Sequence, residues 1–168
     1  MLLAIATRER AACLRRHVGA ILVADQRIIA TGYNGTPTGF ANCDEGGCQR
    51  CAHPERYEAG RGYDVCTCVH AEQNAVLQAA RLGYTVQGST CYTTLRPCFG
   101  CLKELYQAGV AGIRYLNPWE PSDPLEADAY RDLVSEMALR GVAVQRLDLP
   151  EQLLDLRPAL AAEAERAE

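Results

Sequence analysis

Residues 70–116 read HAEQNAVLQAARLGYTVQGSTCYTTLRPCFGCLKELYQAGVAGIRYL, and two kinds of pattern alternate along this stretch. Segments rich in helix-forming residues, at 70–82 and 98–108, are separated by apolar segments typical of buried strands at 89–93 and 113–116. Because helices and strands alternate, the stretch predicts a sheet that is parallel in part, with helices packed on it.

The segments on either side of this stretch extend the predicted sheet. Upstream, two apolar runs, Val18–Val23 and Ile28–Thr31, are joined by a polar Asp25-Gln26 turn, which predicts an antiparallel hairpin. Downstream, a helix over Leu125–Arg140 ends before Gly141 and leads into a strand over Val142–Gln145. The expected class is therefore α/β, a three-layer α/β/α sandwich around a mixed central sheet.

The two ends of the chain have weaker patterns. Leu2–Arg16 predicts a helix of moderate periodicity, and Glu151–Glu168 fits either a docking helix or a solvated tail. At 168 residues the chain suits one domain. We expect residues 1–168 to form it, with a cysteine-rich insertion at about 43–68 and a C-terminal tail at about 150–168.

Charge and hydropathy limit the partners and the cellular location that the sequence allows. The formal net charge of −4 and the isoelectric point near 5.4 disfavour a long nucleic-acid backbone as partner, although a small anion site remains compatible with them. The apolar start, Met1–Ala6, is shorter than a secretion signal, and no segment reaches the ~20 apolar residues of a membrane span. These features predict a cytoplasmic protein that is not bound to a membrane.

Cysteine usage points to metal. The chain has nine cysteines, an odd number, without a secretion signal, and several are two or three positions apart. In a reducing compartment this pattern favours metal thiolates over disulfides, and zinc is the first candidate. Periodicity is absent between Gly35 and Thr67, and a loop of that length is uncommon in a compact domain unless something such as a metal fixes it.

Three residues have the character of catalytic zinc ligands. His70 opens one predicted helix, and Cys98 and Cys101 open the next, after Pro97. Helix N-termini favour the thiolate form that zinc binds. Three protein ligands leave the fourth tetrahedral position for water, as catalytic zinc requires. The alternative is a closed zinc site, in which a further cysteine completes the set and the metal only supports the fold.

Glu72 distinguishes these alternatives. It follows His70 by two positions, so it can lie beside the metal without binding it and transfer protons there. An H-x-E motif followed by P-C-x-x-C is the signature of zinc deaminases, and HAE with PCFGC matches it. A closed structural site has no use for this carboxylate.

Over roughly Ala12–Leu116 the chain resembles the cytidine deaminase superfamily, in particular its deoxycytidylate (dCMP) deaminases. Three motifs carry the likeness: VGAILV leading to GYNGTPTG, then VHAEQNAVL, then TTLRPCFGCLKELYQAGV. The resemblance implies the α/β/α sandwich, zinc on His70, Cys98 and Cys101, and Glu72 as the proton shuttle. It implies hydrolysis of dCMP to dUMP and ammonia, with Asn34 contacting the nucleotide sugar. It also implies homo-oligomers, commonly hexamers, and allosteric control by dCTP and dTTP.

Three residues are candidate substrate contacts. Asn34 lies in a Gly-Tyr-Asn-Gly segment and fits either a sugar contact or a simple turn. Tyr33 can stack on a pyrimidine ring, and we expect this of Tyr33 more than of Trp119. Arg96 stands where dCMP deaminases often have an aromatic residue; it can clasp a phosphate or pair with Glu104.

The remaining cysteines offer further ligands. We expect Cys48, Cys51, His53 and Cys66 to form a closed structural zinc site. By resemblance to dCMP deaminases that carry an additional zinc, Cys13, Cys43 and Cys68 are also candidates. One structural zinc, two separate ones, or free buried cysteines are all compatible with the spacing. Cys91 fits a core thiol in a strand.

Two other functions remain open. The same zinc machinery deaminates other amino-heterocycles, such as a purine base, a riboflavin precursor or adenosine in tRNA, although relatives acting on these generally lack the GYNGTPTG turn. A non-catalytic zinc-binding regulatory relative is the other alternative, and the presence of Glu72 argues against it.

Overall fold

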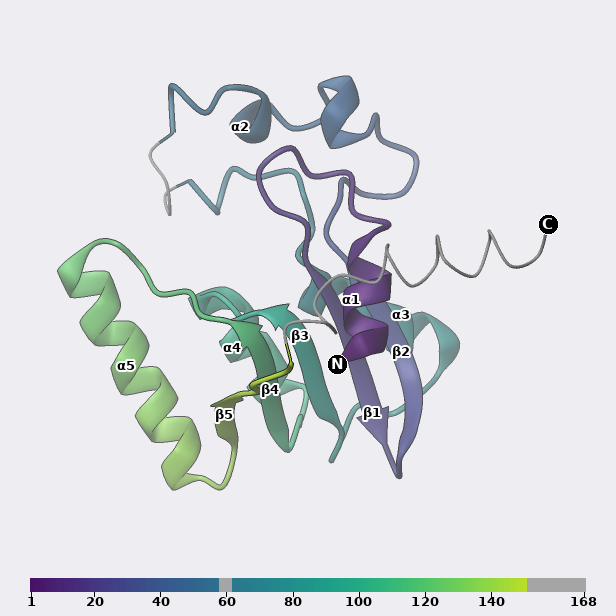
Figure 1. Cartoon of the computed structure of the whole chain (residues 1–168), viewed down its shortest axis with the longest axis vertical. Coiled ribbons are helices and arrows are strands. Elements are labelled where there is room, and N and C mark those ends of the chain that lie inside the picture. The colour runs from purple at the N-terminus through teal and green to yellow at the C-terminus, as the bar shows by residue number, and fades with distance from the viewer. Residues whose placement is uncertain (58–61, 151–168) are drawn as a thin grey trace.

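The structure, a computed structural model, describes residues 1–57 and 62–150. Within them, strands form one sheet in the order β2-β1-β3-β4-β5 (Figure 1). The strands are β1 (Gly19–Ala24), β2 (Arg27–Tyr33), β3 (Thr90–Leu95), β4 (Gly112–Asn117) and β5 (Ala143–Arg146). β1 pairs with β2 and β3 in antiparallel fashion, whereas β3, β4 and β5 are parallel, so the predicted mixed sheet is confirmed.

Helices cover both faces of this sheet. The longer helices are α3 (Ala71–Leu82), α4 (Phe99–Gln107) and α5 (Pro124–Leu139). Their apolar side chains meet those of the strands in one buried core, formed by Ala20, Leu22, Ala71, Ala75, Ala79, Cys91, Leu102, Leu105, Ile113, Tyr130 and Met137 among others. A shorter helix, α1 (Leu2–Arg8), packs on β1.

Two glycines show that α1 and α3 lie on opposite faces. A Cβ on Gly19 would stand 2.1 Å from the carbonyl oxygen of Ala4 in α1, and one on Gly32 would stand 2.1 Å from that of Ala71 in α3. Gly32 pairs with Ala20, the neighbour of Gly19, so the two glycines face opposite ways. The three-layer arrangement predicted from the sequence is thereby confirmed.

Replacement of Gly32 by alanine is expected to lower the free energy of unfolding by about 3 kcal/mol, because the added methyl would overlap the backbone of α3. Urea denaturation of the full chain measures this. Gly35→Ala is the matched control, since a Cβ at Gly35 meets nothing within 4 Å. Equal denaturation midpoints for the two variants would contradict the close packing of β2 on α3.

The hairpin of β1 and β2 turns through Asp25 and Gln26, as predicted. Both residues have positive φ, 48° and 63°, as in the two-residue turns that match the twist of a hairpin. Glycine adopts such a backbone conformation more readily than glutamine does.

Gln26→Gly is therefore expected to raise the free energy of unfolding by about 0.5–1 kcal/mol. Thermal unfolding followed by circular dichroism provides the measurement. Arg27→Gly, at the first residue of β2, is the control and is expected to be destabilising; a lower stability of Gln26→Gly would contradict the turn geometry.

The first helix is shorter than predicted. The sequence pattern favoured Leu2–Arg16, but α1 ends at Arg8. The chain then carries Cys13 to a group of buried cysteines, and the N–H of Leu14 donates to the Sγ of Cys43 at 3.4 Å. These contacts require a non-helical backbone, which explains why the prediction was wrong beyond Arg8.

The segment without periodicity forms a separate layer at one end of the sheet. It contains a 3₁₀ turn, η1 (Cys43–Glu45), and a short helix, α2 (Gln49–Ala52). Figure 1 shows this layer beside the loop that joins α1 to β1. The hydrophobic cluster buried here consists of cysteines, so no aliphatic core supports the layer within the described residues.

The alternatives for Glu151–Glu168 lie outside the described residues. Among the described helices, none is both long enough and apolar enough to cross a membrane.

Candidate active site

The first predicted ligand, His70, is placed by the start of α3. It is the N-cap of the helix, and its backbone N–H donates to the Oε1 of Gln73 at 2.9 Å. The preceding residue, Val69, forms an isolated antiparallel β-bridge with Gly35, and the two residues exchange backbone hydrogen bonds of 2.8 and 3.2 Å. These contacts fix the backbone from which the imidazole projects.

The two cysteines are placed by the start of α4. Cys98 is its N-cap and Cys101 lies in its first turn, buried. The hydroxyl of Tyr130 in α5 donates to the carbonyl oxygen of Pro97 at 2.8 Å and so anchors the turn from the other side. The Nδ1 of His70 lies 3.4 Å from the Sγ of Cys98 and 3.3 Å from that of Cys101.

This donor set suits zinc. A hydrogen bond from Cys101 lowers the pKa of Cys98 to about 4, so Cys98 is a thiolate. Burial disfavours the charged imidazole, but the Cys98 thiolate outweighs it and raises the pKa of His70 to about 9. Two sulfurs and one imidazole nitrogen within 4.8 Å of one another form a three-ligand group, and the described residues supply no fourth ligand in that range.

Glu72 lies beside this group without joining it. Its side chain is buried, and the hydroxyl of Thr93 in β3 donates to its Oε1 at 2.9 Å. Burial raises the pKa of Glu72 above its usual range. A carboxyl group in such surroundings can both accept and donate a proton near neutral pH.

A cavity of about 150 Å³ is lined by this constellation. Its wall includes His70, Glu72, Cys98, Asn34, Tyr63, Trp119 and the arginines 15, 16, 50 and 96. A wider cleft of about 990 Å³ shares His70, Cys98, Tyr63 and Trp119 with it. A buried carboxylate and a group of three metal-ligating side chains thus face a cavity with aromatic and cationic walls, which suits a small aromatic anion.

Comparison of the sequence with protein families identifies the family of this chain. Residues 1–117 match the family model described as the cytidine and deoxycytidylate deaminase zinc-binding region, which covers more than half of the chain. The chain belongs to this family. Zinc is accordingly the metal of this deaminase-family chain.

Two relatives from yeasts are deoxycytidylate deaminases, in accordance with the family. The chain is 42% identical over 107 residues to the deoxycytidylate deaminase of Schizosaccharomyces pombe, covering 64% of this chain and 32% of that protein. It is 40% identical over 152 residues to that of Saccharomyces cerevisiae, covering 90% of this chain and 45% of that protein. This deaminase-family chain thus spans a third to under half of these yeast relatives.

A solved structure matches over most of its length. It is the dCMP deaminase from the cyanophage S-TIM5 in complex with dCMP and dUMP, with a TM-score of 0.62 and 31% sequence identity. The match covers 86% of this chain and 91% of the cyanophage protein. The cytidine-deaminase-like fold expected from the sequence is confirmed.

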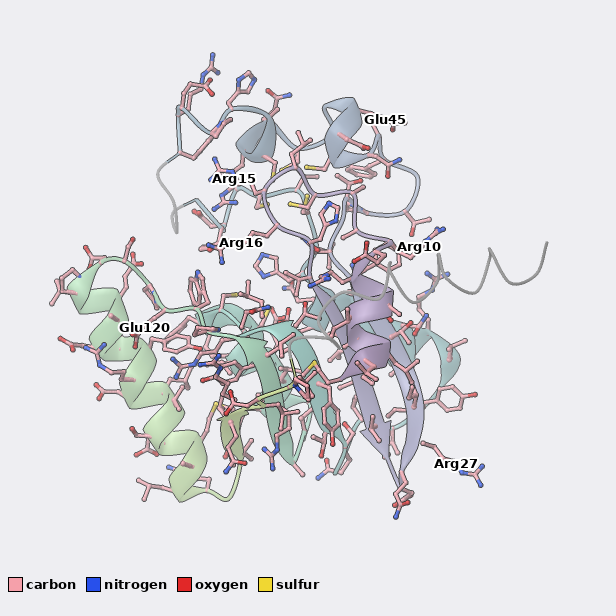
Figure 2. All side chains as sticks on the ribbon, viewed as in Figure 1. Arg10, Arg15, Arg16, Arg27, Glu45 and Glu120 are labelled. Carbon is pink, nitrogen blue, oxygen red and sulfur yellow. The ribbon has the colours of Figure 1, made fainter. Side chains whose placement is uncertain are left out.

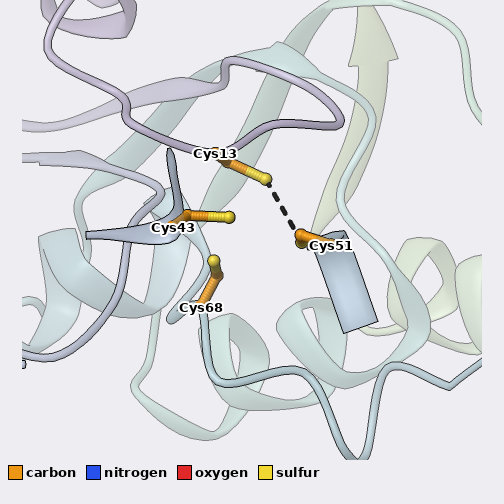
Figure 3. A group of neighbouring side chains, drawn as sticks. All are labelled: Cys13, Cys43, Cys51 and Cys68. Carbon is orange, nitrogen blue, oxygen red and sulfur yellow. Dashed lines mark hydrogen bonds between the residues drawn. The ribbon is translucent and has the colours of Figure 1, made fainter. Parts of the chain in front are cut away.

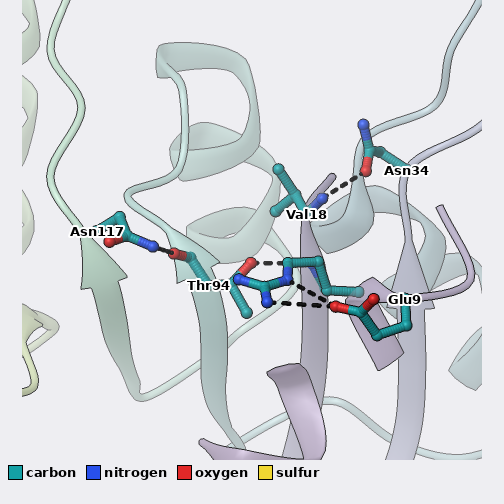
Figure 4. A network of polar contacts seen from close by, with 7 residues as sticks. Glu9, Val18, Asn34, Thr94 and Asn117 are labelled. Atoms are coloured by element: carbon teal, nitrogen blue, oxygen red, sulfur yellow. Dashed lines mark hydrogen bonds and ion pairs between the residues drawn. The ribbon is translucent and has the colours of Figure 1, made fainter. Parts of the chain in front are cut away.

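Asn34, a predicted sugar contact, lines the cavity of this deaminase-family chain but also has structural partners. Its Oδ1 accepts from the N–H of Val18 at 2.7 Å, and its Nδ2 donates to the carbonyl oxygen of Arg16 at 2.7 Å (Figure 4 shows the Val18 contact). A primary amide retains one further N–H and one lone pair. Asn34 therefore ties β2 to the start of β1 and keeps capacity for a ligand.

Tyr33 is not brought to the cavity. Successive strand residues point to opposite faces, so Asn34 points inward while Tyr33 is exposed, with the guanidinium of Arg10 6.0 Å from its ring centre. Tyr63 and Trp119 supply the aromatic wall instead, with ring centres 6.0 Å apart and nearly perpendicular planes. Tyr63 lies in the segment without periodicity, where no sequence signal could select it.

Arg96 does line the cavity. Its guanidinium carbon lies 4.8 Å from the ring centre of Tyr130 and 5.5 Å from that of Tyr115, and its Nε is buried without a hydrogen-bond partner. The alternative partner, Glu104, instead accepts from Gln73 at 3.0 Å. Arg96 thus lines the cavity and carries a buried N–H donor that has no partner within the described residues.

Three further arginines in the cavity wall were missed from the sequence. Arg15 and Arg16 lie between the cysteine-rich layer and the sheet (Figure 2). Arg50 belongs to α2. Arg15 donates to the carbonyl oxygens of Arg50 and Tyr57 at 3.1 and 3.3 Å, and its Nε has no partner. Their only sequence signal was an Arg-Arg pair beside Cys13 and an arginine within CQRC.

The other predicted zinc ligands gather in two overlapping groups. One contains Cys13, Cys43, Cys51 and Cys68 (Figure 3), and the other contains Cys48, Cys51, Cys66 and Cys68. His53 joins neither group, because it follows the end of α2 and its Nδ1 pairs with the Oε1 of Glu55 at 3.2 Å. The expected set with His53 is thus not assembled, and Cys68 stands with the three cysteines instead. Cys91 is buried in the core, apart from both groups.

Proposed function

We propose that this chain is a zinc-dependent hydrolase that converts dCMP and water to dUMP and ammonia. The observation that carries the proposal is a buried carboxylate, Glu72, beside the three-ligand group of His70, Cys98 and Cys101, in a cavity with four arginines. The cyanophage structure with dCMP and dUMP supports the choice of substrate.

The proposed chemistry assigns each group a role. His70, Cys98 and Cys101 would hold zinc, which when bound lowers the pKa of water toward ~7 and makes it a nucleophile at neutral pH. Glu72 takes one proton from the water that attacks C4 and gives it to N3 of the cytosine ring. It then takes the proton of the new C4 hydroxyl and gives it to the amino group, which leaves as ammonia while the C4 carbonyl forms. Thr93 orients its carboxylate, and Tyr63 and Trp119 exclude water from the base.

The phosphate is proposed to meet the cationic wall. Arg15, Arg16, Arg50 and Arg96 line the cavity, although the chain as a whole is acidic. Such a local concentration of guanidinium groups suits a compact dianion better than a neutral nucleoside. Asn34 remains the proposed sugar contact, and Tyr33 is left out because it lies outside the cavity.

A substrate panel tests this function. Ammonia release from dCMP, CMP, deoxycytidine, guanine, a riboflavin precursor and tRNA should be measured with the zinc-loaded chain, and dCMP is expected to react fastest. Turnover of guanine, the riboflavin precursor or tRNA, with none of dCMP, would favour the other amino-heterocycles. Zinc-bound protein as inactive as its Glu72→Gln variant on every substrate would indicate the non-catalytic relative.

Arg96→Ala is expected to raise the KM for dCMP about 10–100-fold, because a hydrogen bond to a charged group contributes about 1.5–3 kcal/mol. Steady-state kinetics with dCMP and with deoxycytidine give the measurement, and the KM for deoxycytidine should change little. Arg27→Ala, at the exposed hairpin, is the control. Equal losses for the nucleotide and the nucleoside would contradict a phosphate contact.

Further properties rest on the family resemblance and are proposed with it. The chain would act as a single cytoplasmic deaminase domain with one or two structural zinc ions in the cysteine-rich insertion. It would assemble into homo-oligomers, commonly hexamers, and respond to dCTP and dTTP. Light scattering and dCMP kinetics with added dCTP or dTTP test assembly and control; a monomer unaffected by both nucleotides would overturn these two proposals.

A further inference from the structure

The two cysteine groups in the insertion share two members. Cys51 and Cys68 belong to both groups, whereas Cys13 and Cys43 belong only to the first, and Cys48 and Cys66 only to the second. We propose that the six cysteines hold two zinc ions as one binuclear cluster, in which the thiolates of Cys51 and Cys68 bridge the ions and the other four are terminal ligands.

The ligand count favours a shared cluster. A tetrahedral zinc takes four ligands, so two separate all-cysteine sites would need eight sulfurs. Two tetrahedra that share an edge need six, two of them common to both. The described residues place six cysteines here, and the two that are common are those that a shared edge requires. A single ion in either group would leave two thiols of the other group beside it without metal.

The sulfur spacing fits this arrangement. Zn–S bonds of about 2.3 Å place the sulfurs of a tetrahedral site about 3.8 Å apart. The Sγ atoms of Cys13 and Cys51 are 3.7 Å apart, as are those of Cys48 and Cys66. A disulfide bond is about 2.05 Å long, and all six cysteines are free. No group contains terminal cysteines from both sides, as expected if each pair belongs to a different ion.

The sulfurs also have the contacts of thiolates. Backbone N–H groups of Arg15 and Arg16 point at Cys13, and that of Leu14 donates to Cys43. Six thiolates and two Zn²⁺ carry about two negative charges, which these N–H groups and the neighbouring arginines offset.

The cluster replaces a hydrophobic core. Five of the six cysteines are at most 7% exposed, and the buried cluster of this layer contains no aliphatic or aromatic residue within the described part of the chain. Without metal, little else would compensate the entropy of ordering this layer. The cluster joins three segments that are distant in the sequence, around Cys13, Cys43–Cys51 and Cys66–Cys68.

The cluster also borders the candidate active site. Cys13, Cys66 and Cys68 line the same cavity as His70, and three of the cavity arginines, Arg15, Arg16 and Arg50, lie within three residues of a cluster cysteine. Formation of the cluster would therefore fix the cationic wall. This consequence rests on the proposed function, whereas the existence of the cluster does not.

Cadmium substitution tests the bridging directly, with no mutation. The purified chain is loaded with ¹¹³Cd²⁺ and its cadmium spectrum recorded. We expect two all-sulfur resonances with ¹¹³Cd–¹¹³Cd coupling through the shared sulfurs. Cadmium bound by His70, Cys98 and Cys101 should give a separate resonance. The spectrum therefore shows independently whether the binuclear cluster or the site of the proposed function is absent. One all-sulfur resonance, or two without coupling, would overturn the binuclear cluster.

Zinc counting by native mass spectrometry of the intact chain provides the second test. In addition to any ion on His70, Cys98 and Cys101, we expect two zinc ions, and Cys43→Ser and Cys48→Ser should each lower this number. A single-ion site would be insensitive to one of these two variants, and that result would overturn the proposal. Cys91→Ser is the matched control, a buried cysteine outside the cluster, and should retain all zinc.

Discussion

Glu72→Gln is expected to lower kcat for dCMP about 10²–10⁴-fold, the contribution typical of a well-placed general acid and base. Glutamine has nearly the same shape, and its amide oxygen can still accept the hydrogen bond of Thr93. It cannot take up and release a proton, so only the chemical step should suffer. Ammonia release under saturating dCMP measures this, with zinc content and circular dichroism on the same samples.

The matched control for Glu72→Gln is Glu136→Gln, an exposed carboxylate on α5 that pairs with Arg140 at 2.9 Å. It should retain wild-type kcat. If Glu72→Gln kept more than a tenth of the wild-type rate with its zinc bound, Glu72 would not be the proton shuttle.

Removal of the catalytic zinc is expected to lower the rate by more than about 10³-fold, because water near its ordinary pKa is a poor nucleophile at neutral pH. Cys101→Ala removes one of three ligands and leaves the insertion cysteines unchanged, so it separates this site from the structural metal. Zinc content and dCMP turnover of the same preparation provide the readouts.

Cys91→Ala is the control for Cys101→Ala, since both remove a buried thiol and Cys91 lies in the core away from the ligand groups. It should lose some stability but keep its zinc and its activity. A Cys101→Ala variant that kept full activity without a zinc ion at this site would contradict the proposed mechanism.

Local patterns were sufficient for most of the fold. The Asp25-Gln26 hairpin and the alternation along residues 70–116 depend on neighbours in the sequence, and both predictions were confirmed. The helix at Leu2–Arg16 failed beyond Arg8 because contacts from Cys13 to cysteines thirty or more residues away compete with helix formation. Such long-range contacts leave no periodic trace.

The residues of the candidate site were also predicted only where a local sequence motif contains them. His70, Glu72, Cys98 and Cys101 belong to compact motifs at two helix starts, so their sequence spacing predicted a group that the structure brings together. The cavity wall is assembled from distant loops, and spacing could not select Tyr63 or Arg15. Chelating spacings similarly identify cysteines that can bind metal, but not which segments converge, so His53 was placed in a set that the structure does not form.

A crystal structure of the zinc-loaded chain with dUMP tests the central claim most directly. The account predicts zinc bound by three protein atoms, from His70, Cys98 and Cys101, with the carboxylate of Glu72 within hydrogen-bond distance of the base. A fourth protein atom bound to that zinc, or Glu72 turned away from the base, would contradict it.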